Sequence, residues 1–187
     1  LLNELFQRSL RVGKRARAET DIGRGRLSIS TAAVELASQV FENLERCRAL
    51  LVGAGEMGEL TAQYLVDAGV ERLLVSNRTL ARAQELARRF GGEAAPFETL
   101  SEHLAGSDIV ISSTAATDYV IGPDDLRPAM RERRGRPLFL IDIAVPRDID
   151  PAVRDIDNIF LFDIDDLEQV IAANRQEREG EIRRVQD

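Results

Sequence analysis

The sequence predicts an α/β fold of the Rossmann type, a doubly wound parallel sheet of about six strands in the order 3-2-1-4-5-6, with extra helices at both ends. Three observations predict it. Apolar stretches of strand length alternate with stretches of helical periodicity from residue 49 to residue 162. Runs such as DIVIS at 108–112 and LFLID at 138–142 are almost continuously apolar, as in strands that helices cover on both faces. A glycine-rich turn joins the first strand to a helix.

The elements follow from these patterns in chain order. Apolar residues at helical spacing predict a helix over 2–19, and the glycine-containing segment 21–30 is expected to be a connector. Ser30 or Thr31 can cap the next helix, which leads into the sheet. We then expect strands at 49–53, 72–76, 93–96, 108–113, 137–143 and 158–162, and helices at 56–68, 79–90, 98–104 and 123–133.

The two ends of the chain differ from its middle. The chain begins without Met and ends within helical sequence, so we expect a piece of a longer protein. After Asp163 the pattern is helical again, with Leu167, Val170 and Ile171 on one face, and then becomes polar on all sides, typical of a projecting spacer. We expect residues 1–29 to be the last helix of an upstream domain with its linker, 30–163 to be a nucleotide-binding domain, and 164–187 to begin a long connecting helix.

Composition narrows the classes of function. The 25 basic and 32 acidic residues give a net charge of -7, which argues against broad electrostatic binding to nucleic acid. The first thirty residues are basic, which indicates either a solvated helix end or a local contact with nucleic acid. No apolar run approaches the roughly 20 residues that span a bilayer, so we expect a cytoplasmic protein with no membrane partner. A single cysteine excludes an internal disulfide.

The glycine-rich turn predicts a dinucleotide site. In GAGEMG at 53–58 the first glycine permits a tight turn, the second lets a pyrophosphate approach the backbone, and the third lets helix and strand pack closely. The phosphates would face the N-terminus of the following helix. The expected cofactor residues in this turn are Gly53, Ala54, Gly55, Glu56, Met57 and Gly58. A purely structural turn is the alternative.

The end of the second strand favours NADP(H) over NAD(H). An NAD-specific domain places an acidic residue here, about 20 residues beyond the glycines, to bind the ribose hydroxyls. This chain instead has Ser76, Asn77, Arg78 and Thr79. The guanidinium of Arg78 suits a 2'-phosphate, although a merely solvated arginine is the alternative. Asn77 and Thr79 can in addition cap the helix that follows.

The end of the fourth strand supplies further candidates for the cofactor site. Ser112, Ser113 and Thr114 follow this strand, and ligands of open parallel sheets bind beyond the carboxyl ends of the strands. We therefore expect these three residues to border the ribose and the nicotinamide. Ordinary loop residues with small hydroxyl side chains are the alternative.

No catalytic set is expected within the chain. His103, the only histidine, is expected to be an ordinary, partly exposed side chain. Arg46 and Arg48 could lower the pKa of Cys47, but that residue precedes the first strand and so lies at the opposite end of the sheet from the crevice. Asp163, Asp165 and Asp166 are expected to satisfy amides at a helix start rather than to bind a metal.

Four segments are specific enough to name a family. GAGEMG at 53–58, SNRT at 76–79, ISSTAA at 111–116 and LIDIAVPRDIDP at 140–151 resemble glutamyl-tRNA reductase. Upstream LFQRSLRVGKRARAETDIGRG and downstream FDIDDLEQVIAANRQER fit the same family. The resemblance implies NADPH-dependent reduction of glutamyl-tRNA to glutamate-1-semialdehyde, the entry step of tetrapyrrole (haem and chlorophyll precursor) synthesis.

The resemblance also implies what the chain lacks. In that family a cysteine of an N-terminal catalytic domain forms a thioester, and a helical C-terminal domain makes the homodimer; a downstream aminomutase is a further implied partner. The chain matches the central domain, and Cys47 does not match the catalytic cysteine, so we expect cofactor binding without catalysis by this chain alone. For Asp142, Pro146 and Arg147 the resemblance suggests a rigid turn that closes the crevice.

Two other functions remain open at this stage. A shikimate-type NADP dehydrogenase domain also carries a glycine-rich turn and an Asn-Arg-Thr strand end, here at residues 77–79. A non-catalytic nucleotide-sensing module, with the projecting helix recruiting a partner, is the second alternative, because fold analogy alone does not decide chemistry.

Overall fold

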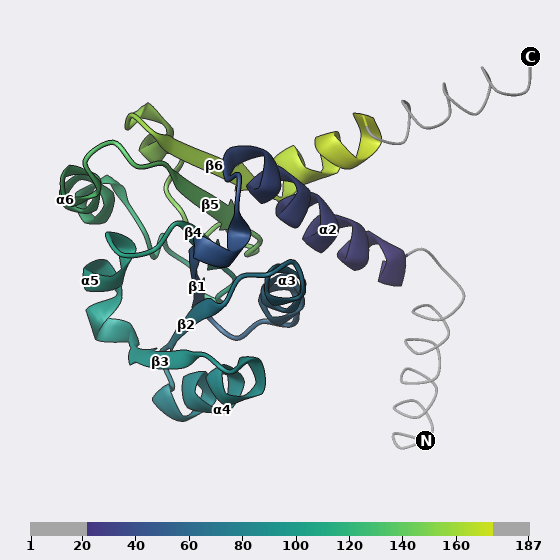
Figure 1. Ribbon diagram of the computed structural model, residues 1–187, viewed down its shortest axis with the longest axis horizontal. Helices are drawn as coiled ribbons and strands as arrows, with labels where there is room; N and C mark the ends of the chain where they lie inside the picture. The colour runs from purple at the N-terminus through teal and green to yellow at the C-terminus, as the bar shows by residue number, and fades with distance from the viewer. Residues whose placement is uncertain (1–21, 174–187) are drawn as a thin grey trace, which may run out of the picture.

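A single six-stranded parallel sheet forms the centre of the molecule (Figure 1). The computed structural model describes residues 22–173. The strand order is β3-β2-β1-β4-β5-β6, which confirms the predicted fold class and order. The strands are β1 (Arg48–Val52), β2 (Arg72–Asn77), β3 (Glu93–Pro96), β4 (Ile109–Ser112), β5 (Leu138–Asp142) and β6 (Ile159–Asp163). Their ends agree with the expected ones to within one residue.

An α-helix or a short 3-10 turn lies between each pair of consecutive strands in the chain. The α-helices are α2 (Ile22–Val40), α3 (Glu56–Asp67), α4 (Leu80–Phe90), α5 (Leu100–Leu104) and α6 (Pro123–Arg133). Short 3-10 turns add η1 (Leu44–Arg46), η2 (Phe97–Thr99) and η3 (Pro151–Asp155). The helix expected at 98–104 is therefore a 3-10 turn followed by a short α-helix.

Helices cover both faces of the sheet, as the continuously apolar strands predict (Figure 1). Alternate residues of each strand point to opposite faces, so Leu51 and Ile111 belong to one core and Leu50 and Val110 to the other. The first core is completed by α2, α3 and α4, the second by α5, α6 and η3. These four strand residues are fully buried. The sheet is thus a rigid frame that fixes where each strand ends.

Helix α2 begins earlier than expected. The connector expected over residues 21–30 is wrong from residue 22 onward, because the backbone is helical from Ile22 to Val40. Ser30 is consequently not a cap: its side chain is buried and its hydroxyl lies 3.0 Å from that of Thr61 on α3, within hydrogen-bond distance. Ala33 and Ala37 are also fully buried in the core that α2 and α3 share. Packing against α3 offsets the roughly 1 kcal/mol that each helical glycine costs.

The chain is helical again after β6. Residues 164–173 form a helix that carries Leu167 into the core, with Val170 and Ile171 packed against it, as predicted. The helix expected at 2–19 and the polar stretch after residue 173 lie outside the described residues, and the expected domain boundaries stay predictions. Within residues 22–173, no helix combines the length and the hydropathy that crossing a bilayer requires.

Candidate functional site

The carboxyl ends of four strands meet at one edge of the sheet. In register, Val52 of β1 lies beside Ser76 of β2 and Ser112 of β4, and Ser112 lies beside Asp142 of β5. The loops that follow these strands enclose a crevice of about 530 Å³. Of the expected cofactor residues, the crevice is lined by Gly53, Ala54, Gly55, Glu56, Met57, Asn77, Arg78, Ser113 and Thr114. Gly58, Ser76 and Ser112 do not line it.

The glycine turn is shaped around Ser113. Gly53 has a φ of +92°, a conformation that favours glycine, and a Cβ added there would lie 2.3 Å from the carbonyl oxygen of Ser113. A Cβ on Gly55 would lie 2.5 Å from the Ser113 hydroxyl oxygen, and one on Gly58 would lie 2.7 Å from the Ser113 Cβ. Gly58 also approaches Leu51 of β1, which confirms that the third glycine allows close helix-strand packing. All three glycines therefore make room for the same residue.

Not all of the cofactor residues expected at the end of β2 lie at the crevice. Ser76 is fully buried and its hydroxyl points to the carbonyl oxygen of Pro96. Thr79 occupies the N-cap position of α4, but its side chain forms no capping hydrogen bond, so that expectation is wrong. The Asn77 amide donates to the Thr79 carbonyl at 3.2 Å instead of accepting from a helix amide. Asn77 and Arg78 remain as the residues that line the crevice here.

Two exposed arginines flank this part of the crevice. The Arg78 guanidinium carbon lies 6.0 Å from the centre of the Phe97 ring, within the range of a cation-π contact. Arg82, in the first turn of α4, also lines the crevice. Neither arginine forms an ion pair with the described part of the chain, residues 22–173. Sequence reasoning missed Arg82, which lies in the first turn of α4, three residues after the N-cap Thr79.

Asp148 holds the loop that follows β4. Its side chain is fully buried and accepts hydrogen bonds from the Ser112 hydroxyl at 2.7 Å, the Thr114 amide at 2.7 Å and the Thr114 hydroxyl at 2.5 Å. The hydroxyls of Ser112 and Thr114 are therefore engaged with protein. The Ser113 hydroxyl forms no hydrogen bond with any residue that the structure describes. Sequence reasoning did not identify Asp148, because its partners lie 34 and 36 residues away.

The loop after β5 closes the crevice on its other side. Asp142 is buried and accepts from the amides of Ala144 at 3.1 Å and Ile149 at 2.9 Å. Burial raises the pKa of the Asp142 carboxyl, since these hydrogen bonds only partly offset its desolvation. Residues 143–145 line the crevice. Arg147 does not: its guanidinium pairs with Asp163 at 2.8 Å and with Asp165.

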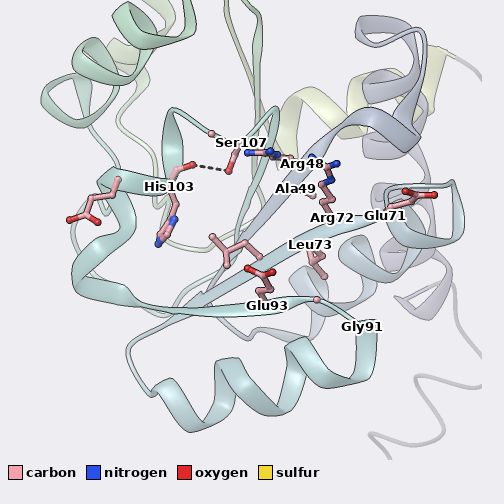
Figure 2. Close-up of a pocket in the computed structure, with 13 residues that line it drawn as sticks. Arg48, Ala49, Glu71, Arg72, Leu73, Gly91, Glu93, His103 and Ser107 are labelled. Atoms are coloured by element: carbon pink, nitrogen blue, oxygen red, sulfur yellow. Dashed lines mark hydrogen bonds between the residues drawn. The ribbon is translucent and has the colours of Figure 1, made fainter.

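The larger cavity lies at the opposite edge of the sheet. It measures about 620 Å³ and is lined by the first residues of β1, β2 and β3, which include Arg48, Arg72 and Glu93 (Figure 2). His103 lines it too and is partly exposed, as expected. Its carbonyl oxygen accepts a hydrogen bond from Ser107 (Figure 2). This cavity contains none of the expected cofactor residues.

The remaining candidates are structural. Cys47 is buried before β1, and burial raises its pKa from about 9.0 to about 11, aided by the nearby charge of Asp108. The expectation that flanking arginines could lower this pKa is wrong, since desolvation dominates. Asp163 and Asp166 cap each other's amides at 3.0 and 3.1 Å, which confirms that they satisfy amides at the start of the helix over 164–173.

Comparisons with known proteins agree with this geometry. A glutamyl-tRNA reductase of Syntrophobacter fumaroxidans is 52% identical over 186 residues, which are 100% of this chain and 40% of that protein. The structure of glutamyl-tRNA reductase from Methanopyrus kandleri is 49% identical, with a TM-score of 0.79, and the match covers 98% of this chain and 46% of that one. The nucleotide-binding domain of glutamyl-tRNA reductase from Thermoplasma volcanium shares the fold, with a TM-score of 0.61 and 17% identity. That match covers 81% of this chain and 96% of that one.

The family assignment follows from a match to a family model over most of the chain. The chain spans about 40% of the length of the curated relatives that it matches over its whole length. The family model for shikimate/quinate 5-dehydrogenase matches residues 35–170, from α2 through the whole sheet to the helix after β6. The chain therefore belongs to the shikimate/quinate 5-dehydrogenase family of domains, and it is homologous over its whole length to part of the glutamyl-tRNA reductases.

Proposed function

We propose that this chain is the NADPH-binding domain of a glutamyl-tRNA reductase, an enzyme that reduces glutamyl-tRNA to glutamate-1-semialdehyde in tetrapyrrole synthesis. The observation that carries the proposal is the identity of about half of all residues to glutamyl-tRNA reductases over the full chain. Because the chain spans only about 40% of these relatives, the activity and the tRNA substrate are inferred for the complete enzyme.

The crevice at the carboxyl ends of the strands fits a dinucleotide. Its volume of about 530 Å³ lies within the range of small-molecule sites. Gly53 and Gly55 present backbone without side chains, so a pyrophosphate can approach closely. Because the N-cap of α3 is Gly55, no side chain caps the first amides of that helix, and its positive end is open to an anion. Bound there, a nicotinamide cofactor would supply the hydride for the reduction.

The residues beyond β2 favour NADPH over NADH. The four positions from Ser76 to Thr79 contain no carboxylate that would repel a 2'-phosphate. Arg78 and Arg82 both line this end of the crevice and have no ion-pair partner among the described residues. Two guanidinium groups suit a phosphate because each can donate more than one hydrogen bond to its oxygens.

The acyl chemistry must come from another part of the complete enzyme. Cys47 is buried, lies before β1 at the opposite edge of the sheet, and has a raised pKa, three properties that disfavour a nucleophile. We infer that a cysteine outside this chain forms the covalent intermediate and that this chain alone binds the cofactor without turnover. The homodimer, the aminomutase partner and the cytoplasmic location stay predictions.

Calorimetric titration of the 187-residue chain tests the proposal. We expect NADPH to bind and NADH to bind at least about tenfold more weakly, because one charge-assisted contact to phosphate is worth that factor. Absence of NADPH binding, or tighter binding of NADH, would contradict the assignment. In the complete enzyme, an upstream cysteine is expected, and its replacement should abolish reduction of glutamyl-tRNA while leaving NADPH binding intact.

A shikimate-type dehydrogenase is the second candidate. The family model that matches residues 35–170 is described as shikimate/quinate 5-dehydrogenase, and this description favours the activity. The identity of about 50% to glutamyl-tRNA reductases outweighs it, since the shared domain binds the cofactor and does not choose the substrate. Turnover of shikimate with NADP⁺ by the complete protein, without turnover of glutamyl-tRNA, would reverse this preference.

A further inference from the structure

The three hydroxyl residues after β4 are not equivalent. The Asp148 carboxylate accepts from the hydroxyls of both Ser112 and Thr114 and from the Thr114 amide, at 2.5 to 2.7 Å. Ser113 lies between these two residues, and its hydroxyl forms no hydrogen bond with the described part of the chain. One buried carboxylate thus engages the two neighbours and leaves the middle hydroxyl available.

Ser113 is also held against the glycine turn. Its amide donates to the Val52 carbonyl at 2.9 Å, and its hydroxyl oxygen would lie 2.5 Å from a Cβ on Gly55. Gly55 is the N-cap of α3, and Glu56 and Met57, the first residues of that helix, line the crevice. The free hydroxyl therefore lies at the point where an anionic oxygen of a bound pyrophosphate would meet the helix end.

Backbone hydrogen bonds to two other segments hold Asp148 in place, so its side chain can in turn position other residues. Its carbonyl oxygen accepts from the amides of Val120 at 2.6 Å and Ile121 at 3.1 Å. The next amide, that of Ile149, donates to the buried carboxylate of Asp142 at 2.9 Å. The loop after β5 and the segment after β4 are thereby joined through one fully buried side chain.

We propose that Asp148 is a positioning residue that holds Ser112 and Thr114 so that Ser113 alone donates its hydroxyl to the pyrophosphate of the bound nucleotide. This inference rests on the proposed function. A carboxylate suits the task because it only accepts hydrogen bonds, and all three of its partners are donors. An asparagine in its place would turn an N–H group toward one of these donors, so Ser113 would lose its fixed position.

A double-mutant cycle in the 187-residue chain tests the proposal. NADPH is titrated, through its own fluorescence, into wild type, Ser113→Ala, Asp148→Asn and the double variant, and thermal unfolding is recorded for each. We expect each single substitution to weaken NADPH binding about tenfold and the double variant to bind no more weakly than either single one. Asp148→Asn should lower the unfolding temperature equally in both backgrounds, because that effect does not pass through Ser113.

Two further variants keep the test decisive. Ser112→Ala removes one of the three donors and leaves the carboxylate in place; it serves if Asp148→Asn does not fold. We expect Ser112→Ala to weaken binding about threefold with Ser113 present and to have no effect without it. Asp150→Asn is the matched control, because Asp150 accepts from the Ala152 amide at the start of η3 and does not line the crevice.

The outcomes separate this inference from the proposed function. If wild type binds no NADPH, the proposed function fails and this inference with it. If wild type binds, but the loss caused by Asp148→Asn or Ser112→Ala persists in full in the Ser113→Ala background, Asp148 does not act through Ser113. An equal loss in Asp150→Asn would overturn the inference as well, because the effect would then belong to the whole loop.

Discussion

The two edges of the sheet carry cavities of similar volume that are built in different ways. At the amino edge, about 620 Å³ is bordered by exposed charges of both signs, among them Arg48, Arg72 and Glu71. At the carboxyl edge, about 530 Å³ is bordered by glycine backbone and by a loop that a buried carboxylate holds in place. Solvated side chains can rearrange freely; the carboxyl edge has such side chains too, in Arg78 and Arg82, but its glycine turn and the loop after β4 are fixed before any ligand arrives. The degree of preorganisation, and not the volume, distinguishes the candidate site.

The largest difference between the two edges is expected when a glycine with positive φ is replaced at each of them. Gly53→Ala should abolish NADPH binding and lower the free energy of unfolding by about 3 kcal/mol, because the new Cβ would clash with the Ser113 carbonyl. Gly91→Ala, where the Cβ would meet nothing within 4 Å, should cost about 1 kcal/mol and leave binding unchanged. Urea unfolding and NADPH titration measure both. If the two variants lost equal free energy of unfolding, the close fit of Gly53 to Ser113 would be unimportant.

A second test asks whether the amino edge has reactive chemistry. Cys47 is the sole cysteine, and its pKa of about 11 leaves about 100-fold less thiolate at neutral pH than the ordinary value of about 9.0 would. Iodoacetamide should therefore modify the folded chain at least about 100-fold more slowly than the chain unfolded in urea. Similar rates in the two states would mean that Cys47 is accessible and activated, and the amino edge would then need a functional explanation.

A third test compares the two ends of one strand. Arg72 begins β2 and Arg78 directly follows it, and both side chains are exposed. Arg78→Ala should weaken NADPH binding about tenfold and change NADH binding less than about twofold, because only NADPH has the 2'-phosphate. Arg72→Ala should change neither. Equal losses of NADPH and NADH in Arg78→Ala would remove the role assigned to this arginine in cofactor choice.

The smallest expected effect concerns the buried carboxylate of Asp142. Because its pKa in the folded chain is raised, the folded state binds more protons than the unfolded state above the ordinary pKa of an aspartate. Wild type should therefore lose stability relative to Asp142→Asn as the pH rises from about 4 to about 7. Thermal unfolding at several pH values measures the difference, and exposed Asp157→Asn supplies the baseline for removal of one carboxylate. If wild type instead gained stability relative to Asp142→Asn as the pH rises, the direction of this pKa shift would be contradicted.

Local sequence signals predicted most of the fold and the centre of the site. Apolar runs located all six strands to within one residue, because strands buried on both faces must be apolar throughout. The glycine spacing located the turn, since each glycine meets a steric demand within a few residues of chain. Arg78 was found in the same way, from its distance along the chain beyond Gly58.

What the sequence did not predict depends on contacts between distant segments. Asp148 lies 36 residues from Ser112, and nothing in the intervening chain indicates that the two side chains meet. Ser112 was consequently expected at the ligand, although its hydroxyl is engaged with Asp148. The early start of α2 has a similar cause: its glycines predict a break, while packing against Thr61 and its neighbours on α3 sustains the helix.

The contact of one serine with three glycines has an evolutionary consequence. Ser113 fills the space beside Gly53, Gly55 and Gly58, so the size of residue 113 and the shape of the turn are linked. A descendant that acquired a leucine at position 113 would lose the turn, and one that replaced a glycine would need more room at position 113. We expect substitutions at these four positions to be inherited together or to be eliminated, so that they form a single unit of selection.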